Sequence, residues 1–422
     1  NADIIAVGAT NDGVNDAIAV VRYDSSGTLD TTFDGDGIFT TSLGGTNAAA
    51  TAVVLEPDDD IVIGGTLDDD FVVLRLQSSN GALDTTFDSD GFNTVDIGGN
   101  PDTGEGLVIQ TSRTFVIAGT ANMGDDEDFA AARFNVNGQL DSTFGTLGII
   151  NIDPSGGDND IAAGLDQLST GELVIAGYTE GADEDAALAR LTVDGDLDTG
   201  FGVNGAVVTI NAGLGDFVYD LAVQANDKII VIGFTNNGNP TNEDFRTVRY
   251  NSNGAIDTNF GDNGYVYTDF GTVLTDDNNQ DEAFGVTIQA DSKVVVVGST
   301  DATSGNQNFA VARYEAENNA PVLTDSSKSG NEDSTLTFSS ADFSNNFDDP
   351  DGDALSLIRI DSLPTNGALA LDGTAVAIND EIASADLALL TFAPNADWNG
   401  STSFDWNAFD GIDYAATAAT LT

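Results

Sequence analysis

Hydrophobic and polar residues alternate in short runs over the first 315 residues of the chain, and the runs recur in a fixed order. A complete unit has four of them: an apolar run such as 106–110, a β-branched run such as 115–119, a run that contains an arginine, and a Thr- or Val-rich run after a Leu-Asp-x-x-Phe motif. Alternation, β-branched content and Gly, Asp or Asn between the runs predict strands joined by hairpins. No window longer than ten residues has a convincing helical period.

One arginine recurs once in each unit and marks the period of the repeat. Its copies, at intervals of 53, 58, 57, 59 and 64 residues, are Arg22, Arg75, Arg133, Arg190, Arg249 and Arg313. The chain has only 12 Lys and Arg, so this one position holds half of them. Periods of this length indicate a solenoid, a propeller or a tandem array.

Four short antiparallel strands per unit are typical of a β-propeller blade, whereas the coils of a β-solenoid are shorter. The sequence contains six second and third strands but five first and fourth strands, because the first unit lacks its first strand and the last unit lacks its fourth. We therefore expect an all-β chain whose residues 1–315 form a six-bladed β-propeller with an incomplete closing blade. Residues just after Tyr314 are too polar to complete it, so we expect a strand from outside the segment to do so.

The pattern changes near Glu315. Residues 316–320 are predicted to be a linker, and residues 321–422 contain both tryptophans and no copy of the repeat. Six or seven strand-like runs in about one hundred residues predict an immunoglobulin-like or cadherin-like β-sandwich. The chain begins with Asn and both of its ends lie in strand-like sequence, so we expect it to be a piece of a longer, processed protein.

The repeat resembles the bacterial delta-sixty family of β-propeller units in large secreted and surface proteins, and the matching text lies at 244–250, 254–261 and 291–298. This resemblance covers nearly three quarters of the chain. It implies a propeller and no catalytic residues.

The C-terminal segment resembles the cadherin-like tandem modules of giant bacterial adhesins, on residues 319–322, 331–333, 347–353 and 398–401. Modules of that type are chained together and stiffened by Ca²⁺. Both resemblances imply an extracellular protein of the bacterial cell surface.

Charge and composition exclude several classes of partner and site. The net charge of −58, from 70 Asp and Glu, repels nucleic acid and anionic lipid. No apolar run is long enough for direct membrane insertion. Cys and His are absent, which removes disulfides, thiolates and imidazole bases and leaves oxygen-only sites for hard cations. Without a nucleophile and base, and without tryptophan in the propeller, we expect no enzyme activity.

Each repeat arginine has two sets of acidic candidates for an ion pair. One set, five or six residues before the arginine, comprises Asp16, Asp70, Asp128, Asp185 and Asp244, with an amide, Asn308, in the last unit. The other set, in the Leu-Asp-x-x-Phe motif, comprises Asp30, Asp84, Asp141, Asp198 and Asp257. A structural ion pair in each blade is favoured over a ligand channel lined by arginine.

Two further positions of the motif are predicted to be structural. The motif phenylalanines, expected to fill the core between blades, are Phe33, Phe87, Phe144, Phe201 and Phe260. The glycines four residues further on, expected to have φ above zero, are Gly37, Gly91, Gly148, Gly205 and Gly264.

Acidic turns are the candidate Ca²⁺ sites. Asp34 with Asp36, and Asp88 with Asp90, place two carboxylates two residues apart on tight turns, although neither matches a complete EF-hand loop. The acidic runs 68–70 and 125–128 are interpreted as solvated surface instead.

A better-supported candidate lies in the C-terminal module. Asp349, Asp351 and Asp353 alternate around a glycine turn, which Glu332 and Asp333 can approach from a neighbouring turn and Asn319 from the linker. An Asx turn without metal is the competing interpretation of this loop.

Together these features predict a non-enzymatic structural and adhesive segment of an exported bacterial surface protein, stabilised by Ca²⁺. It would assemble with itself or with a neighbouring surface protein into a surface layer or fibre. The alternative is a glycan-binding or protein-binding propeller module of an adhesin, for which Tyr219, Tyr265 and Tyr267 are the candidate sugar-contacting aromatics.

Overall fold

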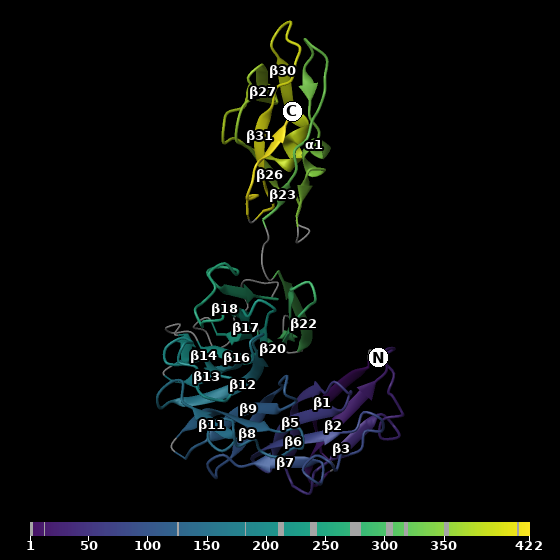
Figure 1. The fold of residues 1–422 in the computed structure, drawn as a ribbon, viewed down its shortest axis with the longest axis vertical. Coiled ribbons are helices and arrows are strands. Elements are labelled where there is room, and N and C mark those ends of the chain that lie inside the picture. Colours follow the sequence, from purple (N-terminus) through teal and green to yellow (C-terminus); the bar gives the residue numbers. More distant parts are fainter. Residues whose placement is uncertain are drawn as a thin grey trace. The chain divides into compact units, whose positions relative to one another are not determined.

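The computed structural model describes residues 3–11, 13–124, 126–181, 183–209, 215–236, 243–270, 280–300, 307–315, 320–349, 354–411 and 413–422. The chain divides into two compact units, Asn1–Ala316 and Glu317–Thr422. Of the predicted linker 316–320, only residue 320 is among the described residues. Each unit is described by itself below (Figure 1).

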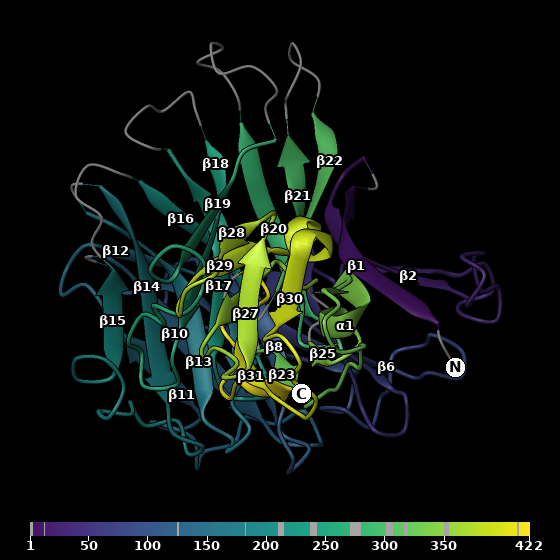
Figure 2. The same ribbon diagram turned by 90° about the horizontal axis from the view of Figure 1, so that it is seen from above.

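The first unit consists of six antiparallel sheets that follow one another in chain order, from purple to green in Figure 2. We call them blades 1 to 6. Blade 1 comprises β1 (Ile4–Asn11), β2 (Asp16–Tyr23) and β3 (Ile38–Thr41); blade 2 comprises β4 (Ala48–Leu55), β5 (Ile61–Leu67), β6 (Asp70–Leu76) and β7 (Phe92–Val95). Blade 3 comprises β8 (Asp102–Ile109), β9 (Phe115–Asn122), β10 (Glu127–Phe134) and β11 (Ile149–Ile152).

Blades 4 to 6 continue the same pattern. Blade 4 comprises β12 (Asn159–Gln167), β13 (Leu173–Glu180), β14 (Glu184–Leu191) and β15 (Ala206–Thr209); blade 5 comprises β16 (Asp216–Val223), β17 (Ile229–Thr235), β18 (Asp244–Tyr250) and β19 (Tyr265–Thr268); blade 6 comprises β20 (Asp281–Ile288), β21 (Val294–Thr300) and β22 (Asn308–Tyr314). The predicted six blades are confirmed. Over the described residues, blade 1 lacks its first strand and blade 6 its fourth, as predicted.

The hydrophobic core of this unit lies between the blades. Each of five clusters of buried side chains combines residues from two successive blades. Between blades 2 and 3, for example, Val62 and Val73 pack with Phe115 and Ile117, and all four are fully buried. A blade between two others is therefore covered on both faces, which explains why its middle strands are apolar almost throughout.

The first strand of blades 2 to 6 carries a β-bulge, and a glycine lies opposite each bulge. A Cβ added to this glycine would lie 1.8–2.0 Å from a backbone carbonyl oxygen of the bulged strand; the glycines are Gly65, Gly119, Gly177, Gly233 and Gly298. Gly8 holds the same register position in blade 1, where no first strand faces it, and nothing lies within 4 Å of its added Cβ. The close approach of the two strands thus requires glycine wherever the first strand is present.

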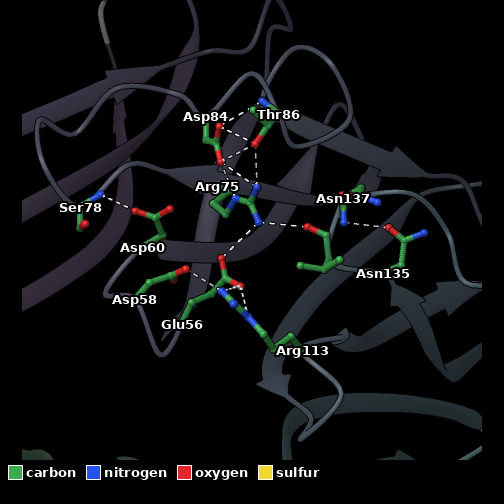
Figure 3. A network of polar contacts seen from close by, with 11 residues as sticks. Glu56, Asp58, Asp60, Arg75, Ser78, Asp84, Thr86, Arg113, Asn135 and Asn137 are labelled. Carbon is green, nitrogen blue, oxygen red and sulfur yellow. Dashed lines mark hydrogen bonds and ion pairs between the residues drawn. The ribbon is translucent and has the colours of Figure 1, made fainter.

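In blades 1 to 4 the repeat arginine connects its own blade to the next one, as Figure 3 shows for Arg75. Arg75 is 7 % exposed, and its Nε donates to Asp84 Oδ2 at 2.8 Å. One Nη1 hydrogen bond, of 3.0 Å, goes to the carbonyl oxygen of Val136 in blade 3. The same nitrogen also contacts Glu56 at 3.2 Å, and Glu56 in turn pairs with Arg113 at 3.0 Å. We call this arrangement the arginine clamp.

The clamp recurs with the same partners. The arginines of blades 1 to 5 pair with Asp30, Asp84, Asp141, Asp198 and Asp257. Their guanidinium groups lie 4.7–5.1 Å from the rings of Phe33, Phe87, Phe144, Phe201 and Phe260. The next-blade carbonyl acceptors for blades 1 to 4 are Ser78, Val136, Val193 and Ser252. Each acceptor is the third residue after the next repeat arginine.

These contacts decide between the two acidic sets proposed from the sequence. The motif aspartates are the ion-pair partners in blades 1 to 5, and the predicted structural ion pair is confirmed there. The motif phenylalanines are at most 3 % exposed, as predicted for core residues. The glycines four residues beyond them have φ between 91° and 102°, again as predicted.

The second unit is a small β-sandwich. One sheet contains β24 (Leu336–Thr337), β30 (Leu390–Pro394), β27 (Gly367–Leu371) and β28 (Thr374–Ala375); the other contains β29 (Glu381–Ala383), β26 (Leu357–Ile360), β31 (Phe404–Phe409) and β32 (Ala419–Leu421). A two-stranded sheet of β23 (Val322–Leu323) and β25 (Phe347–Asp348), helix α1 (Ser340–Ser344) and the 3₁₀ turn η1 (Ser384–Leu389) complete it. Leu369 and Leu390 of one sheet join Ile358 and the fully buried Trp406 of the other in a common core. None of the described helices is long and apolar enough to cross a membrane.

The glycine opposite the bulge gives a first prediction. Gly119→Ala should destabilise the propeller by about 2 kcal/mol or more, because the new methyl group would overlap the Thr103 carbonyl oxygen. Gly8→Ala is the matched control and should be neutral or slightly stabilising, since its site is open. Calorimetric unfolding of both variants tests this, and equal melting temperatures would contradict it.

The arginine clamp gives a second prediction. Arg75→Met should lower the free energy of unfolding of the propeller by about 3–5 kcal/mol, because Asp84 and Glu56 would stay buried without their shared cation. Arg313 makes no hydrogen bond or ion pair with any described residue, so Arg313→Met should change stability by less than about 0.5 kcal/mol. Urea unfolding at low protein concentration measures both values. A loss at Arg75 no larger than at Arg313 would show that the clamp is not stabilising.

Candidate functional site

The predicted turn pairs of the propeller make local backbone contacts. Asp36 Oδ1 accepts the Ile38 N–H at 2.9 Å, and Asp90 Oδ1 accepts the Phe92 N–H at 3.4 Å. Asp34 and Asp88 donate their own N–H groups to carbonyls of the next blade, at 2.8 and 2.7 Å. Among the described residues no third carboxylate joins either pair. A metal at these turns stays a prediction.

The structure describes only part of the predicted site in the C-terminal module. Asp333 Oδ1 accepts the backbone N–H of Asp397 at 2.8 Å, while Glu332 is exposed beside it and Asp349 follows β25. Asn319, Asp351 and Asp353 lie outside the described residues. Over the described part of this module, no three acidic ligand atoms converge. Calcium in this loop therefore remains a prediction too.

Three acidic triads lie elsewhere in the propeller, at positions for which the sequence predicted no site. In each of them, one carboxylate oxygen from every residue lies within 4.8 Å of the others. Two lie at junctions between blades, namely Asp70, Asp96 and Asp102, and Asp244, Asp269 and Asp281; the third, Asp126, Asp128 and Asp153, lies within blade 3. We call them the acidic triads. Asp70 and Asp128 come from acidic runs that the sequence analysis interpreted as solvated, and the structure corrects this for Asp128, which is 5 % exposed.

In two of the triads the three positions come from separate parts of the repeat. One starts the third strand, one follows the fourth strand, and one starts the first strand of the next blade, as with Asp70, Asp96 and Asp102. These two sets are therefore complete only when the next blade is in place. Asp126, Asp128 and Asp153 instead all belong to blade 3. Periodic aspartates after the fourth strand and at the start of the first strand were the signal in the sequence: Asp96, Asp153 and Asp269, and Asp102, Asp160, Asp216 and Asp281.

The triad between blades 2 and 3 combines burial with like charge. Asp102 has no exposed surface, and its pKa is raised to about 6, chiefly by desolvation and to a lesser extent by repulsion from Asp96 and Asp70. The N–H of Ile97 donates to its Oδ2 at 2.6 Å and opposes the rise in pKa. Burial also raises the pKa of Asp70, followed by repulsion from Asp96. This junction thus concentrates negative charge where water is scarce.

The triad of blade 3, Asp126, Asp128 and Asp153, contains a carboxylate oxygen without a donor. Asp128 Oδ2 accepts Nδ2 of Asn151 at 2.5 Å, whereas the buried Oδ1 has no hydrogen-bond partner. Burial raises the pKa of Asp128, and Asp126 and Asp153 raise it further against the effect of Asn151. Asp160, at the start of the first strand of blade 4, is fully buried, and desolvation raises its pKa to about 6.

No basic residue neutralises these two triads. All twelve Lys and Arg lie in the described part of the chain, and none forms an ion pair with Asp70, Asp96, Asp102, Asp126, Asp128 or Asp153. The junction between blades 4 and 5 differs, because Arg246 Nη1 lies 2.5 Å from Asp216 Oδ2. Arg246 occupies the register position that Val72 and Ala130 hold in blades 2 and 3.

The two end blades each have one uncovered apolar face. In blade 6, Phe309 is 100 % and Val311 62 % exposed, whereas the equivalent Phe71 and Val73 of blade 2 are fully buried against blade 3. Phe309, Val311, Val297 and Arg313 of blade 6 define the forward face. In blade 1, Ile4 is 57 % exposed although its equivalent in blade 2 is buried. Ile4, Ala6 and Val21 define the rear face.

These faces mark a seam that the described residues do not close. Neither β1 nor β22 pairs with a strand of the opposite end blade; β1 pairs only with β2 and β22 only with β21. Pairing of β1 with β22 would have contradicted the prediction that a strand from outside completes the closing blade. The described residues show no such pairing, and the outside strand itself stays a prediction.

The aromatic residues considered for glycan binding contact other aromatic residues. Tyr219 lies 5.7 Å from the ring of Phe234 and 5.4 Å from that of Phe284, and burial raises its pKa to about 12. Tyr265 and Tyr267 are stacked at 6.3 Å. These contacts account for their positions through packing, and sugar binding by them remains a prediction.

Comparison with known proteins agrees with this architecture. The model described as "Domain of unknown function (DUF5122) beta-propeller" matches six segments, residues 3–33, 56–87, 114–144, 168–201, 224–260 and 289–318. The model described as "Cadherin-like domain" matches residues 317–422. No curated protein matches the chain.

Solved structures resemble the chain only distantly. A protein from Lactobacillus plantarum is 14 % identical, with a TM-score of 0.42 over 74 % of this chain and 81 % of that one. The PQQ-bound aldose sugar dehydrogenase of Streptomyces coelicolor is 12 % identical, with a TM-score of 0.41 over 73 % and 97 %. An endo-arabinase from Bacteroides thetaiotaomicron is 10 % identical, with a TM-score of 0.34 over 63 % and 93 %. Nothing about activity follows from likeness at this distance. The family matches and the strand order together identify the chain as six units of a beta-propeller domain followed by a cadherin-like domain.

Proposed function

We propose that this chain is a non-enzymatic structural segment of an exported bacterial surface protein, and that it assembles head to tail through the seam between blades 6 and 1. A propeller followed by a cadherin-like domain fits a surface or adhesin-like module. The observation that carries the proposal is the full exposure of Phe309, at a position whose equivalents in blades 2, 3 and 5 are phenylalanines with no exposed surface. We also propose that the repeat belongs to the delta-sixty family and that the protein is extracellular.

The forward face is suited to a blade of the same repeat. In blades 1 to 5 the side chains at its positions are buried by the rear face of the following blade. Blade 1 of a second copy presents such a rear face, on which Ile4 and Val21 correspond to the buried Ile61 and Leu74 of blade 2. Apolar area on both faces would leave water on contact, which favours association.

The clamp supplies a polar complement to this apolar contact. The arginines of blades 1 to 4 donate to the third residue after the next repeat arginine. For Arg313 that acceptor would be the carbonyl oxygen of Ser25 in blade 1 of the second copy. The contact joins two different surfaces, so each copy keeps one free forward face and one free rear face. Such a heterologous contact propagates into a filament unless the rotation closes a ring.

The net charge opposes this association, because every copy carries −58. Repulsion between copies weakens as ionic strength rises and the Debye length falls to about 8 Å at 0.15 M salt. Assembly should therefore require salt or bound cations. A salt-rich medium outside the cell suits such a protein.

Sedimentation velocity over a range of protein concentration tests the assembly. In 0.5 M NaCl the unmodified chain should form oligomers that grow with concentration, while Phe309→Asp should remain monomeric because a carboxylate would be buried in the contact. Val203→Asp is the matched control, since Val203 is 78 % exposed on a turn outside both faces, and it should assemble normally.

Two results would refute the proposal. An unmodified chain that stays monomeric at every concentration would show that the seam closes within one molecule or stays open. Equal assembly of Phe309→Asp and the control would show that copies associate through another surface.

A further inference from the structure

The C-terminal module contains a pocket of about 400 Å³ that the proposed function does not use. Residues of two sequence motifs that lie far apart in the chain, 331–333 and 398–401, line it together. We propose that this pocket binds a short neutral glycan, with the indole ring of Trp398 as the stacking surface. The pocket belongs to the module alone, so the proposal does not rest on assembly through the seam.

The turns that carry the two motifs are joined by a hydrogen bond. The backbone N–H of Asp397 donates to Asp333 Oδ1 at 2.8 Å. Both residues have a left-handed backbone conformation, with φ of 58° at Asp333 and 56° at Asp397. Aspartate adopts this conformation more readily than most residues, and the hydrogen bond holds the two turns against each other. The pocket is therefore formed before a ligand arrives, which reduces the entropy cost of binding.

Trp398 offers a flat apolar surface to a ligand. Its side chain is partly exposed and contacts no described aromatic ring, whereas the other tryptophan, Trp406, is fully buried in the module core. A Cβ added to Gly400 would lie 3.2 Å from the indole ring, so glycine at this position keeps that side of the ring clear. The C–H groups on the face of a pyranose ring can pack against such a surface, while its hydroxyl groups point outward to polar partners.

The rest of the lining supplies both apolar and polar contacts. Phe338 and Phe404, each 3 % exposed, belong to the module core and reach the pocket. Asn331, Glu332 and Asn399 also line it, and their side chains make no hydrogen bond with any described residue. Amides donate and accept hydrogen bonds and a carboxylate accepts them, which suits the adjacent hydroxyl groups of a sugar. Small-molecule sites of about 300–1,000 Å³ have this combination of apolar walls and a few polar groups.

The charges around the pocket favour a sugar without an acidic group. Lys328 is the only basic residue among the described residues that line it. Its Nζ lies 2.5 Å from Asp342 Oδ2 and 5.7 Å from the ring of Phe338, so this ammonium group already has its partners. Glu332 and the net charge of −58 would repel a uronic acid or a sulfated sugar.

A hydrophobic peptide is the competing occupant of such a pocket. Its apolar side chains would cover Asn331, Glu332 and Asn399 without offering them hydrogen bonds, and burying polar groups in this way costs free energy. Sugar hydroxyl groups satisfy the same side chains. The lining therefore favours the glycan.

Calorimetric titration of the full chain with maltose, cellobiose, lactose and N,N′-diacetylchitobiose tests the proposal. The titration uses the Phe309→Asp background, so that assembly cannot contribute to the signal. We expect saturable binding of at least one of these sugars. Trp398→Ala should weaken that binding about tenfold or more, because the stacking surface is lost, whereas Trp398→Phe should retain most of it. Glu332→Ala should also weaken binding, and its exposed position makes a folding defect unlikely to interfere.

Each variant has a matched control elsewhere. Tyr267→Ala removes an aromatic side chain that is 46 % exposed in the propeller, and Asp386→Ala removes an exposed carboxylate of the module outside the pocket; both should leave binding unchanged. Absence of binding by every sugar tested would overturn the proposal. So would binding that survives Trp398→Ala or is lost in Tyr267→Ala, because the sugar would then bind elsewhere. Equally tight binding of the uronic acid form of the same sugar would overturn the preference for a neutral ligand.

Discussion

This propeller depends on one constraint. The hydrogen bonds of a buried guanidinium group can be completed only by two successive blades together. The motif aspartate and phenylalanine of the same blade hold Arg75 on one side, and a carbonyl of the following blade completes its hydrogen bonds. Removing any of these partners would leave a buried charged donor without an acceptor. The spacing of the blades and the direction of the array therefore follow from the same side chain. The apolar clusters between the sheets add most of the buried area, but they are less selective about register.

Buried carboxylates have different neighbours at the clamp and at the acidic triads. At the clamp, each buried carboxylate has a guanidinium beside it, and the pKa of Asp84 stays below its usual value although desolvation acts in the opposite direction. In the triad between blades 2 and 3, the buried Asp102 instead faces the exposed Asp96 and the half-buried Asp70, and its pKa rises. Of the 12 basic residues, set against 70 acidic ones, five are the clamp arginines of blades 1 to 5. The distribution of arginine thus determines which buried acidic groups have a cation beside them.

The sequence predicts the local structure well because strands, turns and motif roles depend on neighbouring residues. The missing first and fourth strands, the buried phenylalanines and the turn glycines all followed from period and spacing. The partner of the arginine was left between two acidic sets, because choosing Asp84 over Asp70 requires the curvature of the third strand and its turn. The acidic triads that span two blades were missed for a related reason. Asp70, Asp96 and Asp102 are separated by strands, and only the stacking of two blades brings them together. The bulge opposite Gly119 could likewise not be predicted from the sequence, because a glycine at the end of a β-branched run is also typical of a turn.

The position of the carbonyl acceptor has a consequence for how such arrays change in length. Blades 2 to 4 carry both halves of the contact: an arginine that donates forward and, three residues later, a carbonyl that accepts from behind. Duplicating or deleting one of these repeats by recombination would therefore leave the neighbouring clamps paired. The number of blades can then change without a compensating substitution at the clamp.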